Sequence, residues 1–350
     1  MSQQLIIGGE SIAPGERRII ELPLPPLTTH SKLEMPIHVV RGRKNGPRLL
    51  VCAALHGDEI NGVEIIRRLV SDKAISRLRG DLIAIPIVNV YGFIHQIRYL
   101  PDRRDLNRCF PGSDKGSMAA RLAYLFLHEI VEKCTHGIDL HTAATHRDNL
   151  PQVRACLSDP ATLEMAHAFP VPILLDAPFR PGTIREAASK LNIPWLVYEA
   201  GEALRFDEVS IRAGQRGILQ VMRQIGMLPK RRTKKPYLPQ VARKSYWIRT
   251  HQSGIYRSLV PMGALVNKGD LLGLIDDPYG CNEEQVIAPT SGIVIGRTNL
   301  PLVYEGDAIC HIARFKHIED AADSVESFQS EFEILAEEIG DEINESSPIL

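Results

Sequence analysis

The sequence predicts an α/β fold in which a mixed sheet is flanked by helices and followed by a smaller all-β domain. Apolar strand-like stretches alternate with amphipathic helical stretches between about residues 46 and 228, which is typical of a mostly parallel or mixed sheet covered on both faces. After residue 240 the sequence changes to short strands separated by glycine turns. The chain has 350 residues, more than one small core usually holds, so we expect two domains.

The first domain, residues 1–228, divides into a β segment and an alternating region. Over 1–45 we expect extended stretches at 18–24 and 35–41, separated by proline-rich breaks. In the alternating region the predicted strands are 48–55, 82–88, 136–140, 171–175 and 194–199. The predicted helices are 60–70, 117–133, 160–168, 184–191 and 207–225, and the first of them carries apolar residues at helical spacing.

The remainder of the chain divides into three segments. The charged, proline-bounded stretch over 229–236 predicts a basic linker over 229–240; a phosphate or nucleic-acid patch is the alternative, but residues 229–236 contain no interleaved aromatic residue. Residues 241–315 predict the β-rich domain. Residues 316–350 are acidic, yet Val325, Phe328, Phe332, Leu335 and Ile339 recur at helical spacing. This amphipathic tail must pack on the body of the chain itself or on a neighbouring subunit of a homo-oligomer.

The composition is that of a soluble globular enzyme, with 44% hydrophobic and 24% charged residues. A net charge of −1 argues against nucleic acid or an anionic membrane as the main partner. No apolar run approaches the roughly 18 residues that span a bilayer, and the N-terminal stretch has no features of a signal peptide. The six cysteines are scattered without a C-x-x-C pair, so we expect a reduced, cytoplasmic protein.

The stretch His56-Gly57-Asp58-Glu59 lies where a predicted strand turns into a predicted helix. The spacing lets His56 and Glu59 face one point at the carboxyl edge of the sheet, where α/β proteins place their sites. An imidazole and a carboxylate suit Zn²⁺, which takes three protein ligands in a catalytic site, and His141 in Asp139-Leu140-His141 is the best candidate for the third. The motif is short, however, and acids that favour a helix N-terminus also explain it.

Two further loops carry residues suited to chemistry. Asp105-Leu-Asn-Arg-Cys-Phe-Pro-Gly112 follows three upstream arginines, Arg98, Arg103 and Arg104. Arginine binds carboxylates through planar, paired donors, although surface ion pairs with neighbouring acids explain the same composition. Glu199 ends an apolar strand ahead of Gly201, a position suited to a general base; an ordinary strand-end acid is the alternative.

Four of these features occur in one order that resembles the succinylglutamate desuccinylase/aspartoacylase family, a branch of the zinc carboxypeptidase clan. They are H-G-D-E, R-Y with D-L-N-R, D-L-H, and V-x-E-x-G, and together they cover about residues 48 to 202. The phrases H-G-D-E-x-N-G and R-D-L-N-R-x-F-P-G are similar to those of bacterial deacylases such as N-acetyl-diaminobutyrate deacetylases. The resemblance implies a carboxypeptidase-like sheet and makes residues 1–228 a zinc-hydrolase catalytic domain.

The resemblance also implies roles for individual residues. One Zn²⁺ per chain would be bound by His56, Glu59 and His141, with Glu199 as the general base. Asn107 and Arg108 would hold a substrate carboxylate, and Arg185 resembles a second substrate-binding arginine. Arg98 would polarise the scissile carbonyl, but its spacing to D-L-N-R leaves Arg103 and Arg104 as alternatives. Aspartoacylase also places a tyrosine of its C-terminal domain in the site; the sequence does not assign the equivalent here, and Tyr256, Tyr279 and Tyr304 are the candidates. The loops over 142–154 and 179–185 are expected to line the substrate pocket.

The expected function is hydrolysis of the amide of a small N-acylated amino acid to a carboxylate and a free amine. A metallocarboxypeptidase acting on peptides and a non-catalytic binding or carrier module are the alternatives. The C-terminal phrases V-x-K-G-D-x-L-G, A-P-T-S-G and V-x-E-G-D-x-I resemble the barrel-sandwich hybrid of biotinyl and lipoyl domains. Those domains carry the cofactor on a lysine just before A-P-x-S-G. Residues 281–285 contain no lysine, which argues against a carried cofactor.

Overall fold

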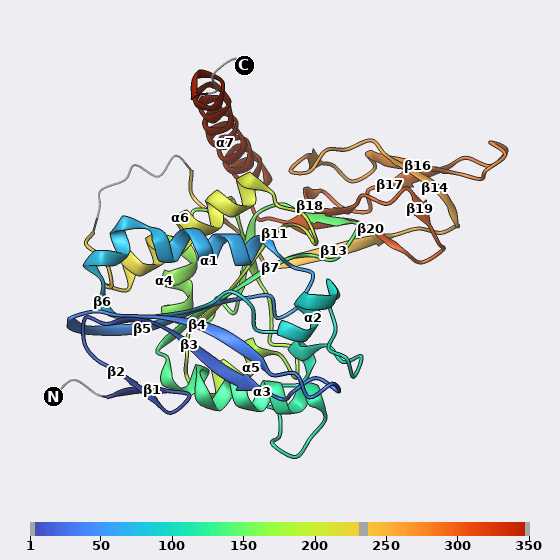
Figure 1. Ribbon diagram of the computed structural model, residues 1–350. Coiled ribbons are helices and arrows are strands. Elements are labelled where there is room, and N and C mark those ends of the chain that lie inside the picture. Colours follow the sequence, from blue (N-terminus) through green and yellow to red (C-terminus); the bar gives the residue numbers. More distant parts are fainter. Residues whose placement is uncertain (1–3, 231–236, 347–350) are drawn as a thin grey trace.

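The protein is described by a computed structural model covering residues 4–230 and 237–346, with side chains up to Phe332. Its body is a nine-stranded mixed sheet in the order β12-β10-β9-β11-β7-β5-β6-β4-β3 (Figure 1). These strands are β3 (Arg17–Leu24), β4 (Leu33–Arg41), β5 (Lys44–Ala53), β6 (Arg79–Ile85), β7 (His136–Ala143), β9 (Gln152–Ala155), β10 (Ile173–Asp176), β11 (Trp195–Glu202) and β12 (Gln240–Ala242).

The central strands of this sheet run parallel and are buried on both faces. β5 pairs in parallel with β6 and β7, and β7 pairs in parallel with β11. Along β5, Leu50 and Cys52 join one hydrophobic core, whereas Leu49 and Val51 join the core on the opposite face. This explains the uninterrupted apolar run in the sequence, because a strand covered on both sides has no polar face. The carboxyl ends of these strands therefore meet at one edge.

Helices cover both faces of the sheet (Figure 1). The helices are α1 (Asn61–Ser71), α2 (Val90–His95), α3 (Met118–Glu129), α4 (Pro160–Ala168), α5 (Ile184–Lys190), α6 (Glu208–Gln224) and α7 (Ile318–Ser346), with short 3₁₀ turns at Lys73–Arg77, Leu106–Arg108 and Val131–Lys133. The apolar sides of α1, α4 and α6 pack in one core, and those of α3 and α5 pack in the other. The five helices predicted in the alternating region are all present, but the one expected over 117–133 ends at Glu129.

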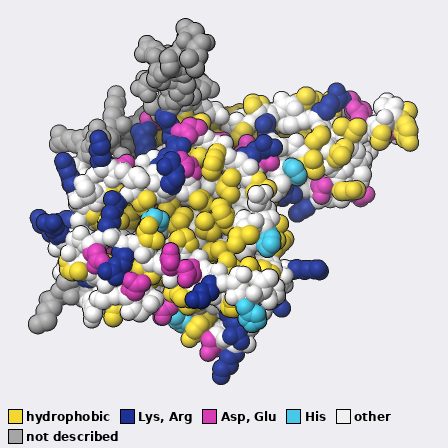
Figure 2. Space-filling model, viewed as in Figure 1, with side chains coloured by type: hydrophobic (Ala, Val, Ile, Leu, Met, Phe, Trp, Pro, Cys, Tyr) yellow, Lys and Arg dark blue, Asp and Glu magenta, His cyan; other side chains and the backbone are white. Residues whose placement is uncertain are grey.

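The C-terminal region is all-β, as predicted, and extends from the body as an arm (Figure 1). Its strands are β13 (Lys244–Arg249), β14 (Gly254–Ser258), β15 (Leu265–Val266), β16 (Leu271–Asp276), β17 (Glu284–Ile287), β18 (Gly292–Thr298), β19 (Leu302–Val303) and β20 (Ala308–Arg314). One sheet has the order β13-β20-β18-β15, and the outer sheet has the order β17-β16-β14-β19. Apolar side chains gather on the arm in the view of Figure 2, and Ile287 of β17 and Leu302 of β19 are among its exposed apolar residues.

A short strand of the body, β8 (Arg147–Asn149), connects the two regions. It pairs with β18 of the arm rather than with the nine-stranded sheet. Neither β8 nor β9 was expected from the sequence. A separate two-stranded sheet of β1 (Leu5–Ile7) and β2 (Glu10–Ile12) lies near the N-terminus.

The segments after residue 228 are more closely tied to the body than the expected linker and tail imply. Residues 231–236 of the expected linker over 229–240 lie outside the described residues, while Tyr237 is buried and β12 joins β10 at the edge of the large sheet. The first part of α7 also packs on the chain's own body, because Phe328 and Phe332 lie in the core that contains α1 and α6. Leu335 and Ile339, the other expected members of its apolar stripe, lie outside the described side chains. None of the helices in the described part of the chain combines the length and apolar character that crossing a membrane requires.

Candidate functional site

The loop that follows β5 carries the first two residues of the site. His56 and Glu59 lie between the end of β5 at Ala53 and the start of α1 at Asn61. Gly57 lets this loop pass close to α2: a Cβ atom there would lie 1.9 Å from the backbone carbon of Gly92. Any side chain at position 57 would therefore push the loop away.

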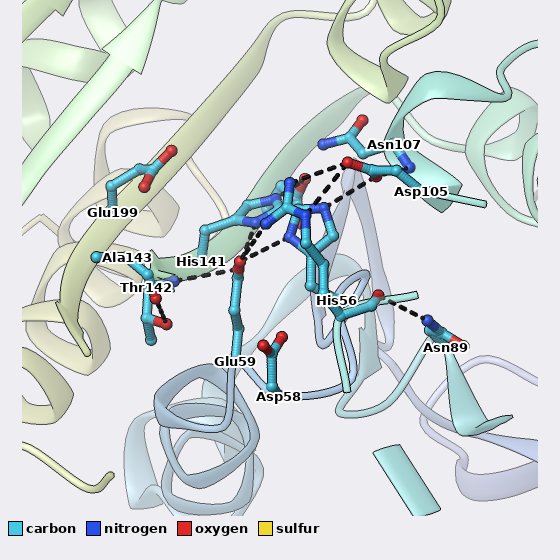
Figure 3. A network of polar contacts seen from close by, with 12 residues as sticks. His56, Asp58, Glu59, Asn89, Asp105, Asn107, His141, Thr142, Ala143 and Glu199 are labelled. Atoms are coloured by element: carbon cyan, nitrogen blue, oxygen red, sulfur yellow. Dashed lines mark hydrogen bonds and ion pairs between the residues drawn. The ribbon is translucent and has the colours of Figure 1, made fainter. Parts of the chain in front are cut away.

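The neighbouring strand β7 brings the third residue to the same point. Ala53 at the end of β5 pairs with Leu140, so His141 projects beside the loop that follows β5. His56 Nδ1 lies 2.7 Å from Glu59 Oε1, and His141 Nδ1 lies 2.7 Å from Glu59 Oε2 (Figure 3). All three side chains are buried, and their candidate ligand atoms lie within 4.8 Å of one another.

A carboxylate lies behind each imidazole. His56 Nε2 donates to Asp105 Oδ1 at 3.1 Å, and His141 Nε2 donates to Asp139 Oδ2 at 2.7 Å. An ionised carboxylate only accepts hydrogen bonds, so these contacts place a proton on each Nε2. Each Nδ1 also faces a carboxylate oxygen of Glu59, so either a second proton or a cation must lie between these atoms. Residues 56, 59 and 141 could thus hold a metal ion, and their chemistry fits one.

The electrostatics of the cluster agree with a cation site. Burial would raise the pKa of Glu59, but the charges and hydrogen bonds of His56 and His141 hold that pKa well below its usual range. Burial likewise would lower the pKa of His141, yet Asp139 and Glu59 raise it well above its ordinary value. The pKa of Asp105 is held low, against burial, by His56 and Arg98. Three carboxylates around two imidazoles therefore favour a positive charge at this point.

Asp58 and Asp139 each adjoin a predicted ligand, but Asp58 accepts no hydrogen bond from either imidazole. The carboxylate of Asp58 contacts Thr145 Oγ1 at 3.5 Å instead. Asp139, the other acid next to a predicted ligand, does hold an imidazole, and the second such acid is Asp105 from the arginine-rich loop. The contact between Asp105 and His56 has no local signal in the sequence, because the two residues are 49 positions apart.

Of the three arginines considered for the carbonyl, the structure brings Arg98 to the cluster. Its guanidinium donates to Glu59 Oε1 at 3.2 Å and to Asp105 Oδ2 at 2.9 Å. Arg103 and Arg104 are exposed, and Arg104 lies 3.8 Å from Asp102. Arg98 therefore faces the cluster, whereas its two alternatives face solvent.

Glu199 lies on β11 directly opposite His141 of β7 in the register of the sheet. Its carboxylate stands apart from the His–Glu–His cluster and is drawn without a contact to it (Figure 3). Glu199 Oε2 accepts a hydrogen bond from Asn149 Nδ2 at 3.1 Å, and Oε1 lies 3.7 Å from Arg154 Nε. The acid is thus held beside the cluster without touching it.

One cavity of about 630 Å³ joins all of these groups. It is lined by every residue expected to act in the site: His56, Glu59, Arg98, Asn107, Arg108, His141, Arg185 and Glu199. Asn107 Oδ1 accepts from the backbone N–H of Ile184, which anchors it to the start of α5. Arg185 donates to the backbone oxygens of Ala177 and Pro178 and lies over the ring of Phe179.

The cavity is also lined by three further arginines, Asn149 and one aromatic residue of the arm: Arg147, Arg154, Arg180, Asn149 and Trp247. The first four lie in the loops over 142–154 and 179–185, which are expected from the sequence to line the substrate pocket, whereas Trp247 was not anticipated. None of the three candidate tyrosines of the C-terminal region, Tyr256, Tyr279 and Tyr304, lines this cavity. Tyr256 is buried in the core of the arm, while Tyr279 and Tyr304 are 88% and 77% exposed.

A mixed sheet covered on both faces, with a buried His–Glu–His cluster at the carboxyl edge and an all-β arm beside it, defines a carboxypeptidase-like class of α/β protein. Within that class, a model of the succinylglutamate desuccinylase/aspartoacylase catalytic domain matches residues 45–225. The chain belongs to this family.

Individual relatives agree with this assignment. The chain is 26% identical over 296 residues to the N-alpha-acetyl-L-2,4-diaminobutyric acid deacetylase of Halomonas elongata, covering 80% of this chain and 85% of the relative. A crystal structure of succinylglutamate desuccinylase/aspartoacylase from Rhodobacter sphaeroides superposes with a TM-score of 0.77 at 25% identity, over 86% of this chain and 95% of the other. The product-bound ectoine utilization protein EutE (DoeB) from Ruegeria pomeroyi has the same fold, with a TM-score of 0.78 at 22% identity over 86% and 97% of the chains.

Proposed function

We propose that this protein is a zinc-dependent deacylase that hydrolyses the amide bond of a small N-acylated amino acid. The observation that carries the proposal is the buried His56–Glu59–His141 cluster at the wall of a cavity that also contains Glu199. Membership of the family and the deacetylase activity named for the relative from Halomonas elongata support the same reaction class.

The cluster supplies the three protein ligands that a catalytic zinc site takes, namely two imidazoles and a carboxylate. When bound, zinc would act as a Lewis acid and would lower the pKa of a bound water molecule toward about 7. Asp105 and Asp139 fix the two imidazoles by accepting hydrogen bonds from their Nε2–H groups, so both Nδ1 atoms would be turned toward the ion.

Glu199 is the proposed general base. It lines the cavity, stands close to the cluster in the sheet register, and touches none of the proposed ligands. In the proposed reaction its carboxylate takes a proton from the attacking water. The same proton then passes to the leaving nitrogen as the amide C–N bond breaks, which yields a free carboxylate and a free amine.

The remaining cavity residues are proposed to bind and orient the substrate. Arg98 faces the cluster and would stabilise the oxyanion that forms on the scissile carbonyl. Asn107 and Arg108 would hold the α-carboxylate, with Arg108 as a charged donor at the exposed end of the cavity.

The charge of the cavity narrows the class of substrates that it would bind. Six arginines line it, at positions 98, 108, 147, 154, 180 and 185, against two carboxylates, Glu59 and Glu199. This balance favours an N-acyl amino acid that carries negative charge and disfavours a cationic side chain. A cavity of about 630 Å³ also suits a small molecule better than a peptide, which makes a peptidase the weaker alternative.

The test combines metal analysis with hydrolysis of N-acetyl and N-succinyl amino acids. We expect about one zinc ion per chain and release of free amino acid. Glu199→Gln should lower kcat on the order of 100- to 10,000-fold, because it removes the proton acceptor while keeping the shape. Glu202→Gln is the matched control, since Glu202 ends the same strand but does not line the cavity. Protein without zinc, together with a fully active Glu199→Gln variant, would overturn the proposal.

A further inference from the structure

We propose that Asn149 is a positioning residue that orients the carboxylate of Glu199, and that strand β18 of the arm holds Asn149 in place. The inference rests on the proposed function only for the role of Glu199 as the base. With this role for β18, the all-β arm is part of the active site rather than an appendage to it.

The contact between the two side chains is specific. Asn149 is 6% exposed, and its Nδ2 donates to Glu199 Oε2 at 3.1 Å. The other oxygen of the same carboxylate, Oε1, lies 3.7 Å from Arg154 Nε. With Oε2 bonded to a neutral donor and Oε1 beside a guanidinium, the plane of the carboxylate is set and its two oxygens are distinct. A proton acceptor must be held in this way to meet the attacking water.

The arm fixes Asn149 through a row of residues that lie opposite one another on four strands. Asn149 of β8 pairs with Gly296 of β18, Gly296 pairs with His311 of β20, and His311 pairs with Trp247 of β13. Residues directly opposite in a sheet project to the same face. Trp247 at one end of the row and Asn149 at the other both line the cavity. The backbone bond from Leu150 N–H to Ile295 O, at 3.1 Å, continues this attachment.

Gly296 leaves the space that the asparagine needs. A Cβ atom at position 296 would lie 2.9 Å from Asn149 Oδ1 and 3.3 Å from His311 Cβ. Because β18 presents no side chain there, the Oδ1 end of the amide can rest against the strand while the Nδ2 end faces Glu199. A carboxylate at position 149 would instead place two acceptors against each other, which explains an amide at this position.

The first experiment measures kcat, KM, zinc content and thermal stability of Asn149→Asp and of the smaller, neutral Asn149→Ser. We expect kcat to fall about 10- to 100-fold, the loss typical of a hydrogen bond to a charged group, with KM and zinc content close to wild type. Thr298→Val is the matched control, because Thr298 lies on the same β8–β18 ladder but pairs with Arg147. Wild-type kcat in both Asn149 variants, with a folded protein, would overturn the inference.

The second experiment separates positioning of Glu199 from a general structural role. If Asn149 acts through Glu199, Asn149→Ser should cost nothing further in a Glu199→Gln background. An equal loss in both backgrounds overturns the inference. Gly296→Ala should reproduce the selective loss of kcat, because its methyl group displaces the amide. A Glu199→Gln variant that stays fully active would instead refute the proposed base, and the two failures are therefore distinguishable.

Discussion

At the residue scale, the acids behind the two histidines determine what the cluster can bind. Asp105 and Asp139 each accept a hydrogen bond from the Nε2–H group of an imidazole, and Asp105 also pairs with Arg98. A histidine held in this way presents its other nitrogen in a fixed direction and is a better ligand. Asp105 thus connects His56, a proposed zinc ligand, to Arg98, which is proposed to polarise the scissile carbonyl.

We therefore predict that Asp105→Asn weakens zinc binding about 10- to 100-fold, because the neutral amide supports the imidazole less well. Competition with a chelator of known affinity measures this effect. Asp102→Asn is the control, since Asp102 lies on the same loop and pairs with Arg104 instead. Unchanged zinc affinity in the Asp105 variant would show that this acid is a surface ion pair, the alternative that the sequence left open.

Local spacing predicts some residues of the site, and contacts through space supply the others. His56 and Glu59 can be found because three positions at a strand–helix junction turn both side chains to one point. Asp105 and Asn149 reach their partners across 49 and 50 positions, and no local pattern records such contacts. Trp247 was missed for the same reason, since the pairing of β8 with β18 joins the arm to the body beside the cavity.

At the scale of elements, short strands are the part of the fold that the sequence does not predict. β8 has three residues and β9 has four, too few for an alternating pattern to stand out. The long apolar strands β5, β7 and β11 could be predicted because burial on both faces makes them continuously hydrophobic. The strand that joins the two regions was thus among those least visible in the sequence.

The strand pair β13–β20 carries a buried histidine that makes stability depend on pH. His311 stacks on Trp247 with 4.5 Å between ring centres and is 4% exposed. Burial, with a contribution from the charge of Arg154, lowers the pKa of His311 from 6.5 to about 3. Between these pH values the unfolded chain binds a proton at this histidine that the folded protein does not. The contribution of His311 to the free energy of unfolding is therefore fully present above pH 6.5 and is lost as the pH is lowered toward 3.

Replacing this histidine should flatten the acid side of the stability profile. In urea unfolding between pH 4.5 and 7, His311→Gln should reduce the slope of the unfolding free energy by up to about 1.4 kcal/mol per pH unit. His30→Gln, at an exposed position, serves as the matched control. Parallel profiles for wild type and His311→Gln would mean that His311 is protonated in the folded protein.

At the scale of the whole molecule, charge is distributed unevenly. The chain has a net charge of −1, yet six arginines line one cavity against two carboxylates. Such a cavity attracts anions from a distance, and added salt screens that attraction because the Debye length falls from about 10 Å at 0.1 M to about 3 Å at 1 M.

We predict that kcat/KM for an anionic N-acyl amino acid falls by about tenfold between these salt concentrations, while kcat changes little. Steady-state kinetics with an N-succinyl substrate measures this directly. Arg180→Gln, which removes an exposed cavity arginine, should make the dependence shallower. A kcat/KM that does not respond to salt would argue that the arginines are neutralised by neighbouring groups.

The tail of the chain contributes to the core of the catalytic body. Phe328 of α7 is 1% exposed and meets Tyr237 edge-on, with 5.7 Å between ring centres, in the core shared with α1, α4 and α6.

Phe328→Ala should therefore lower the free energy of unfolding by about 3–5 kcal/mol, the usual cost of removing a buried aromatic ring. Glu326→Ala, an exposed change on the same helix, should stay within about 0.5 kcal/mol of wild type. Chemical unfolding of both variants measures the difference. If the two proteins unfold alike, the apolar stripe of α7 does not stabilise the body, and a surface for a neighbouring subunit becomes the better explanation of its pattern.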